Sequence, residues 1–461
     1  MDPIAPRSVV ATASRLAPWL IALAGFALDL VAYWPGQMSF DSAYTWWQAR
    51  GGETMNVTPP VLIFLWRFCD ALLEGPGLVF ALHLVLFWCG LALLADALRL
   101  APARAFALML PVAFAPVPWL LRGHVWTDVG LFSALVFALG AIAQAHATQR
   151  RAWLAVALPP LFYAAAIRHN ALPAILPLAA WLAWLAAGRG ASRWRVASVA
   201  GAIGIAAIGL TAVINAQVQR RVPLWPAAAE WDLAAISIAT GEMLLPPFTI
   251  GPGLDVPELA AAFRHWSAVP MLVDTQHGMR GPFSDYTPEQ LAALRSAWFD
   301  AIRAHPVAWL RHHALQAEAL LGVHDPSWPR ELIYFDGEYA YRDNPPVAPN
   351  ETPLHEALMR AASRLVRTPL LAGWPYLAIG LVAVPLAWRR RGDLAGLVAL
   401  IASTSAWLYL LPLIPLVPAE LRYLGWSIFA SLLAAALAIV VPRSFRNGPD
   451  TLAPSPQRTF R

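Results

Sequence analysis

Long apolar runs alternate with short polar connections along most of the chain. A helix needs about twenty predominantly apolar residues to cross a hydrocarbon layer of roughly 30 Å. Runs near this length predict ten transmembrane helices: Leu16 to Trp34, 77–98, 105–121, 129–147, 152–167, 171–187, 196–214, 370–388, 394–411 and 421–441. The pattern therefore predicts an all-α polytopic membrane protein.

Two longer polar segments, residues 35–76 and 215–369, interrupt this rhythm. In the second, Thr287-Pro288-Glu289-Gln290 is a capping box with proline at the first helical position. The apolar spacing that follows predicts an amphipathic helix within a helical loop domain. We expect a membrane unit of seven spans over 1–214, a domain over 215–369, three further spans over 370–441 and a disordered tail over 442–461.

The arginine distribution predicts the orientation, because clusters flank alternate connections. These clusters are Arg99/Arg104, Arg150/Arg151, Arg189/Arg193/Arg195, Arg389/Arg390/Arg391 and Arg443/Arg446. Arginine-rich connections stay on the cytoplasmic side. Both termini are therefore expected in the cytoplasm of a bacterium, and residues 35–76 and 215–369 on the periplasmic face of its inner membrane.

Composition supports the membrane assignment and narrows the partners. The chain is 58% hydrophobic and 13% charged, whereas soluble domains are about 25% charged. The arginines flank apolar runs and form no solvated basic face, so a lipid bilayer is the expected partner and nucleic acid is not. Cys69 and Cys89 are too few for a disulfide framework and form no CxxC pair.

Polar residues in the periplasmic connections, all of them ionisable except Asn170, form the candidate site. They are Asp41, then Arg122, His124 and Asp128, then Arg168, His169 and Asn170, and finally Arg422. Ionisable groups at span ends are costly and mark function by default. Because all of them lie at one membrane face, we expect a single site for an anion, most simply a phosphate.

Simpler structural roles stay open for several of these residues. Asp41 precedes a short aromatic stretch with Tyr44 and is either a catalytic group or a helix N-cap. Asp128 has the same two interpretations at the start of its span. Arg422 is either a site residue or the partner of Glu420 in an internal ion pair.

Histidines gather in the long polar segment at His305, His312 and His313, beside Arg311, and again at His324 with Asp325. Their spacing matches no HExxH or similar zinc motif, so we expect a solvated helix face rather than a metal site. The sequence indicates no cofactor, although metal dependence is left open.

The order of Asp41, Thr58-Pro59-Pro60 and Asp128 within seven spans resembles the GT-C superfamily of integral-membrane glycosyltransferases. This group includes the dolichyl-phosphate-mannose protein mannosyltransferase and lipid A aminoarabinose transferase type. The segment HPVAWLR, which ends at Arg311, is similar to one in bacterial relatives. The chain departs from the pattern where Thr58 replaces the usual histidine and where Asp41 stands alone.

The resemblance implies an inverting transferase that moves a sugar from a polyprenyl phosphate to an envelope glycan, lipid or protein. One well-placed base suffices for such a displacement, and this role falls to Asp41, with Asp128 orienting substrate. The donor phosphate is assigned to Arg122, His124, Arg168, Arg311 and Arg422. The substrate is also oriented by Tyr44, His169 and Asn170.

Two other classes compete with this interpretation. An O-antigen ligase or polymerase also uses a polyprenyl-linked donor. A secondary transporter of a lipid-linked or small anionic substrate predicts charges near the membrane midplane and inverted repeats. Asp29 is the one strong acid inside a clean span, and no repeat is visible in the sequence.

Overall fold

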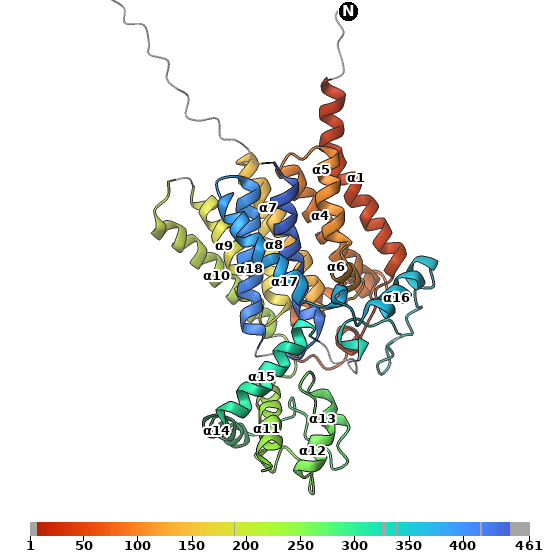
Figure 1. Cartoon of the computed structure of the whole chain (residues 1–461), viewed down its shortest axis with the longest axis vertical. Helices are drawn as coiled ribbons and strands as arrows, with labels where there is room; N and C mark the ends of the chain where they lie inside the picture. The colour runs from red at the N-terminus through yellow and green to blue at the C-terminus, as the bar shows by residue number, and fades with distance from the viewer. Residues whose placement is uncertain (1–6, 189, 324–328, 338, 415–416, 443–461) are drawn as a thin grey trace, which may run out of the picture.

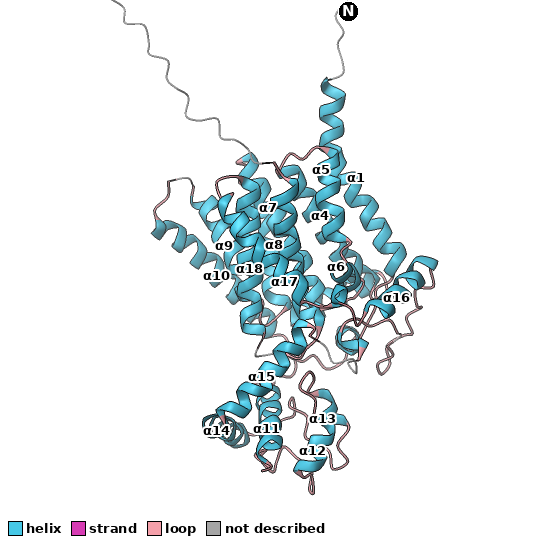
Figure 2. Cartoon of the chain, viewed as in Figure 1, coloured by secondary structure: helices cyan, strands magenta, loops and turns pink. Residues whose placement is uncertain are grey.

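The computed structural model describes residues 7–188, 190–323, 329–337, 339–414 and 417–442. Regular structure in these ranges is helical, and the described residues form only isolated β-bridges such as Gln37 with His124 (Figure 2). The predicted all-α class is confirmed. His324, Asp325 and nearly all of the expected tail over 442–461 lie outside the described residues.

Six of the described helices are long and apolar enough to span a membrane. They are α1 (Arg7–Tyr33), α4 (Gly77–Ala97), α7 (Thr127–Thr148), α10 (Arg193–Asn215), α18 (Leu394–Leu413) and α19 (Gly425–Val440), the last counted with the four residues before it. They stand together as one bundle in Figure 1. The number of spans rises to seven if one bent helix pair is a single span.

The other four expected spans are shorter or broken. The stretch over 105–121 divides into α5 (Pro102–Ala113) and α6 (Pro116–Arg122), which meet at 71°, because Pro116 lacks an N–H and disfavours helical geometry at the preceding residue. The remaining three, α8 (Ala152–Ile167), α9 (Leu172–Ala187) and α17 (Trp374–Arg389), each have 16 residues. That length is about 24 Å, so ten full spans are not confirmed.

Small residues bring α4 and α7 into close contact at the centre of the bundle. A Cβ atom added to Gly90 would lie 2.5 Å from the backbone nitrogen of Phe137, and one on Gly140 would lie 2.4 Å from the Gly90 carbonyl oxygen. Such close backbone approach is typical of packing between membrane helices. By contrast, apolar α10 buries none of its residues, which suits a lipid-facing helix.

Between α10 and α17, five helices form a separate apolar core at one end of the bundle (Figure 1). They are α11 (Pro226–Thr240), α12 (Val256–Ala262), α13 (Val269–Val273), α14 (Pro288–Ala304) and α15 (Pro306–Leu321), and we call residues 226–321 the loop domain. The expected capping box is present, with Thr287 and Gln290 each bonded to the backbone of the other. Farther along, α16 (Pro353–Leu365) packs against α1 instead.

Short elements fill the end of the bundle that faces the loop domain. They are α2 (Phe40–Ala49), α3 (Pro60–Leu72), the 3₁₀ turns η1 (Arg330–Leu332) and η2 (Pro369–Leu371), and η3 (Leu421–Leu424), which leads into α19. The Gln37–His124 bridge joins the strand-like entry of α2 to the connection before α7. Segments as far apart in the sequence as α2 and η3 therefore lie at the same end of the bundle.

Candidate functional site

Arg422 in η3 is the centre of a cluster of charges. Its Nη2 lies 2.6 Å from Asp41 Oδ2, and its Nε lies 2.5 Å from Glu420 Oε2. The same Nε is 4.0 Å from Asp128 Oδ2. One guanidinium thus faces three carboxylates contributed by α2, α7 and the segment before η3.

Arg168, in the connection between α8 and α9, extends the cluster. It forms an ion pair with Asp128, and its Nε donates to Asn170 Oδ1 at 3.1 Å. Its Nη1 donates to Thr127 Oγ1 at 3.3 Å. The structure therefore brings together Asp41, Asp128, Arg168, Asn170 and Arg422, which are far apart in the sequence.

Aromatic rings support both guanidiniums. Arg168 lies 4.9 Å from the centre of the Tyr423 ring, and Arg422 lies 5.1 Å from that of Trp126. A cation over such a face is held electrostatically without being neutralised. The indole N–H of Trp126 in turn donates to Ser39 Oγ at 2.8 Å, which anchors the ring beside α2.

Exposure differs sharply across the cluster. The side chains of Asp128, Arg422 and Arg168 are 4%, 10% and 12% exposed, whereas that of Asp41 is 56% exposed. Charges sheltered from water interact more strongly than exposed ones. Burial also raises the pKa of Glu420, although the Arg422 guanidinium opposes this shift. Asp41 is therefore the accessible edge of a sheltered charge network.

The simple helix-cap role is wrong for both aspartates. Ser39 and Trp126 occupy the N-cap positions of α2 and α7, and Asp41 and Asp128 lie in the first turn. The helix dipole favours carboxylates at these positions, but no side-chain cap bond is formed at either helix start. The expected Glu420–Arg422 ion pair does form, as part of the larger cluster.

Arg122 does not join the cluster, contrary to the sequence prediction. Its Nε and Nη2 donate to both oxygens of Asp29 at 2.7 and 3.0 Å, and its Nη1 donates to the Ala113 carbonyl at 2.9 Å. Both side chains are fully buried. Because Asp29 takes two of its nitrogens and a carbonyl takes the third, Arg122 is a structural residue that joins α1 to α6 rather than a phosphate ligand.

His124 is also used by the fold instead of by a substrate. The Phe335 backbone N–H donates to its Nε2 at 3.0 Å, while its Nδ1 bonds the Leu120 carbonyl at 3.0 Å. Burial lowers the pKa of His124 to about 4, so the ring is neutral at neutral pH. It stacks on Trp126 at 3.9 Å between ring centres and thereby supports the ring beneath Arg422.

The remaining predicted residues lie outside the ion pairs. His169 lies beside the backbone of Asn56 and Val57, and burial lowers its pKa. The hydroxyl of Tyr44 donates to Met55 Sδ at 3.1 Å. Arg311 is exposed on α15 in the loop domain, and no described contact joins it to the cluster.

An aromatic group beside Asp41 was missed by sequence reasoning. Tyr341 packs edge-on against Phe40, Tyr44 and Trp47 of α2, with ring centres 5.5 to 5.9 Å apart. The Asn344 side chain donates to the Ala43 carbonyl at 2.8 Å and fixes this segment on α2. No local pattern signals this contact, because the partners are about three hundred positions apart in the chain.

The arrangement can hold an anion and move a proton. Among the described residues, neither Nη2 of Arg168 nor Nη1 of Arg422 makes a hydrogen bond to protein. Two such donors near one another suit a phosphate oxyanion. The exposed carboxylate of Asp41 provides a base at the same place.

Comparisons of the chain with family models, curated proteins and solved structures find no match.

Proposed function

We propose that this protein is a membrane glycosyltransferase that moves a sugar from a polyprenyl phosphate to an envelope glycan, lipid or protein. The observation that carries the proposal is the convergence of Asp41, Asp128, Arg168 and Arg422 at one end of an apolar bundle. A lipid-linked phosphate donor needs cations beside a base, and both must lie at the membrane surface.

In the proposed reaction the donor phosphate binds the free nitrogens of Arg168 and Arg422. Asp41 contacts a different nitrogen of Arg422, Nη2, so its exposed carboxylate stays beside the bound phosphate. Asp41 then takes the proton of the acceptor hydroxyl. As the proton leaves, the acceptor oxygen attacks the anomeric carbon from the face opposite the phosphate. The bond from carbon to phosphate oxygen breaks, the configuration inverts, and the two arginines stabilise the departing polyprenyl phosphate. Asp128 orients Arg168.

The same proposal places the protein in the inner membrane of a bacterium, with both termini cytoplasmic and the loop domain periplasmic. Among the described residues, Arg99, Arg150 and Arg391 follow the ends of α4, α7 and α17, at the opposite end of the bundle from Asp41, as the positive-inside tendency requires. We further propose a GT-C-like core, in which α8, α9 and α17 also cross the bilayer. Prolines in all three helices are common in membrane helices.

Transport is less well supported by the geometry. Asp29, the acid that a midplane ion pathway would use, is fully buried and bonded to Arg122 on both oxygens. Indole N–H groups of Trp88 and Trp119 donate to the same carboxylate at 2.7 and 3.0 Å. A group so enclosed is suited to holding helices together rather than to binding and releasing an ion.

Mass spectrometry of envelope glycolipids and glycans tests the proposal. A deletion strain should lack one sugar modification, and wild-type protein should restore it while Asp41→Asn protein, at equal abundance, should not. Accumulation of an unmodified acceptor would name the substrate. An unchanged envelope in the deletion strain would refute the transferase, and a polymer of altered length without loss of any sugar would favour the polymerase alternative.

A further inference from the structure

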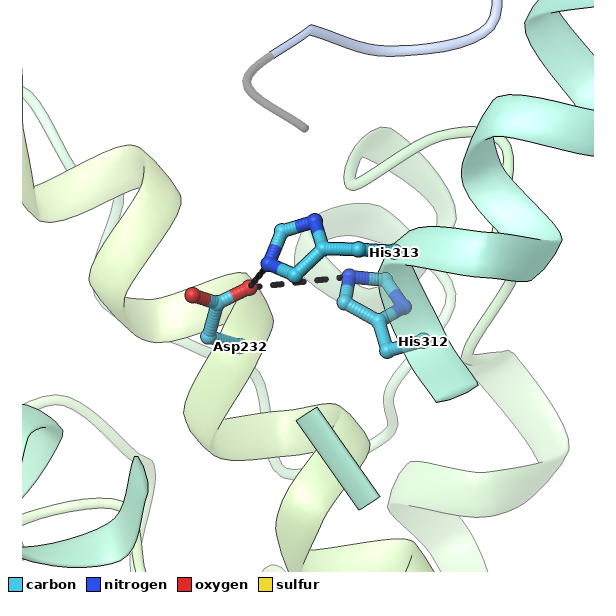
Figure 3. Close-up of side chains that lie close together, drawn as sticks. All are labelled: Asp232, His312 and His313. Carbon is cyan, nitrogen blue, oxygen red and sulfur yellow. Dashed lines mark ion pairs between the residues drawn. The ribbon is translucent and has the colours of Figure 1, made fainter. Parts of the chain in front are cut away.

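A buried group of metal-ligating side chains lies in the loop domain, away from the charge cluster. Asp232 of α11 and the adjacent His312 and His313 of α15 each direct one ligand atom to a common point, and these atoms lie within 4.8 Å of one another (Figure 3). His313 Nε2 is 3.2 Å from Asp232 Oδ1, and His312 Nε2 is 3.7 Å from the same oxygen. The expected solvated helix face is wrong here, because His312 is 1% exposed.

These separations suit a tetrahedral ion. Zinc is held at about 2.0 to 2.2 Å by histidine nitrogen and carboxylate oxygen, which puts neighbouring ligand atoms of a tetrahedron about 3.3 to 3.5 Å apart. The two distances from Asp232 Oδ1 to the histidine nitrogens, 3.2 and 3.7 Å, bracket this range. Three protein ligands leave a fourth position for water.

The surrounding hydrogen bonds orient each ligand, as partners of metal ligands do. Both Trp298 and Trp309 donate their indole N–H to Asp232 Oδ2 at 2.9 Å, which turns Oδ1 toward the histidines. The Nδ1 of His313 bonds Gln316 Oε1 at 2.9 Å, and that of His312 bonds His265 at 3.0 Å. With Nδ1 of each ring engaged, both Nε2 atoms are left for a ligand.

A simple ion pair does not satisfy this group. A protonated His313 would balance the charge of Asp232. His312 Nε2 would still have no hydrogen-bond partner, and among the described residues this buried atom has none. A buried polar atom without a hydrogen-bond partner is destabilising. A cation between the three side chains accepts a lone pair from each of them.

We propose that Asp232, His312 and His313 bind a divalent transition-metal ion, with Zn²⁺ the best fit, that fastens α11 to α15. Little solvent reaches the site, since the three side chains are between 1% and 13% exposed. The metal site is also connected to the segment that leads to Arg422, because Gln316, which bonds His313, donates to the Val417 carbonyl. In addition, Ala419 donates to the Trp266 carbonyl at 2.9 Å. The ion would therefore stiffen the domain that holds the segment leading to Arg422.

Metal content of the full-length protein in detergent tests this inference independently of any transferase activity. The protein is purified through a tag without histidine, exchanged into metal-free buffer and analysed by elemental mass spectrometry. We expect one equivalent of metal per wild-type chain, and a loss of about tenfold or more in zinc affinity for both Asp232→Asn and His313→Gln.

The control is His277→Gln, a histidine of the same domain that pairs with Glu258 outside the group; it should keep its metal. A chelator should lower the melting temperature of the wild type, and zinc should restore it, with no such response in His313→Gln. If Asp232→Asn fails to fold, this wild-type response and His313→Gln decide. Wild-type protein that holds no metal and does not respond to zinc overturns the proposal, as does equal metal loss in His277→Gln.

Discussion

The Arg422 guanidinium lies 2.6 Å from the Asp41 carboxylate, so the turn before the last membrane helix contacts the first polar connection of the chain. Asp128 and Arg168, from the middle of the membrane bundle, complete the same network. The proposed site thus needs residues on both sides of the loop domain. A fragment that ends after the first seven expected spans would lack its central cation.

Arg168 should matter for turnover through its charge. Arg168→Ala is expected to lower the transfer rate by about 10² to 10³, the usual effect of removing one electrostatic stabiliser. Arg168→Lys should lose less, because it keeps the charge without the planar guanidinium. The measurement is consumption of a polyprenyl-phosphate sugar by purified protein, with melting temperature as the fold check.

A matched control for Arg168 is Arg50→Ala at the same end of the bundle. Arg50 pairs with Asp70 and Glu74, outside the cluster, and its loss should leave turnover nearly unchanged. Wild-type rates in folded Arg168→Ala would remove Arg168 from the site.

The Asp29–Arg122 pair should affect stability rather than chemistry. Arg122→Met leaves the fully buried Asp29 carboxylate without its cation, which typically costs 3 to 5 kcal/mol. Adding Asp29→Leu should restore part of the loss, because it removes the unpaired buried charge, while the indole N–H groups of Trp88 and Trp119 lose their acceptor.

Thermal unfolding in detergent checks this prediction, and the double variant should keep the wild-type transfer rate. A double variant that folds well but no longer transfers sugar would return Arg122 to the phosphate site.

The sequence predicted what depends on local pattern. Apolar periodicity indicated the helical class, and the spacing of Thr287 and Gln290 indicated a helix start that the structure contains. The sequence also indicated that polar connections would meet at one end. Which residues would pair there was less visible, since Arg122 could face either outward or toward Asp29.

Long-range contacts explain the other misses. The partner of His124 is the backbone of Phe335, and the partner of His312 is Asp232 on another helix. Neither pair has a fixed spacing that a motif could encode. The sequence predicted one straight span over 105–121 because these residues are apolar throughout. Apolar content gives no sign of the bend that Pro116 introduces.

His124 should make folding sensitive to acid. Burial lowers its pKa from 6.5 to about 4, so the fold favours the neutral ring. Its contribution is fully present above about pH 6.5 and is lost as the pH falls toward 4, by about 3 kcal/mol in all.

Melting curves of wild type and His124→Gln across this range isolate the effect. The wild type should be the more stable at pH 7, and the gap should narrow steadily below pH 6.5. A gap that is independent of pH would show that His124 is not held neutral.

The proposed orientation predicts opposite labelling of two introduced cysteines. Asp285→Cys, in the loop domain where this side chain is 81% exposed, should react with an impermeant maleimide in spheroplasts. Arg391→Cys, at the far end of α17, should react only after lysis. Wild-type protein gives the background, since Cys69 is buried and Cys89 partly buried. Labelling of position 391 in sealed spheroplasts would show that the orientation is the reverse of the proposed one, with Asp41 on the cytoplasmic side.

The identity of the base is decided by Asp41→Asn compared with Glu420→Gln. Asparagine keeps an oxygen that can accept from Arg422 but cannot take the acceptor's proton, so transfer should fall by about 10² or more while donor binding and melting temperature are retained. Glu420→Gln, which removes the other close carboxylate on Arg422, should cost only a few-fold because the base remains. Both rates are measured on purified protein with a polyprenyl-phosphate sugar at saturation.

If Asp41→Asn is fully active and Glu420→Gln is inactive, the base is Glu420. If both variants are active, the base is expected to be Asp128, whose carboxylate lies between the two arginines.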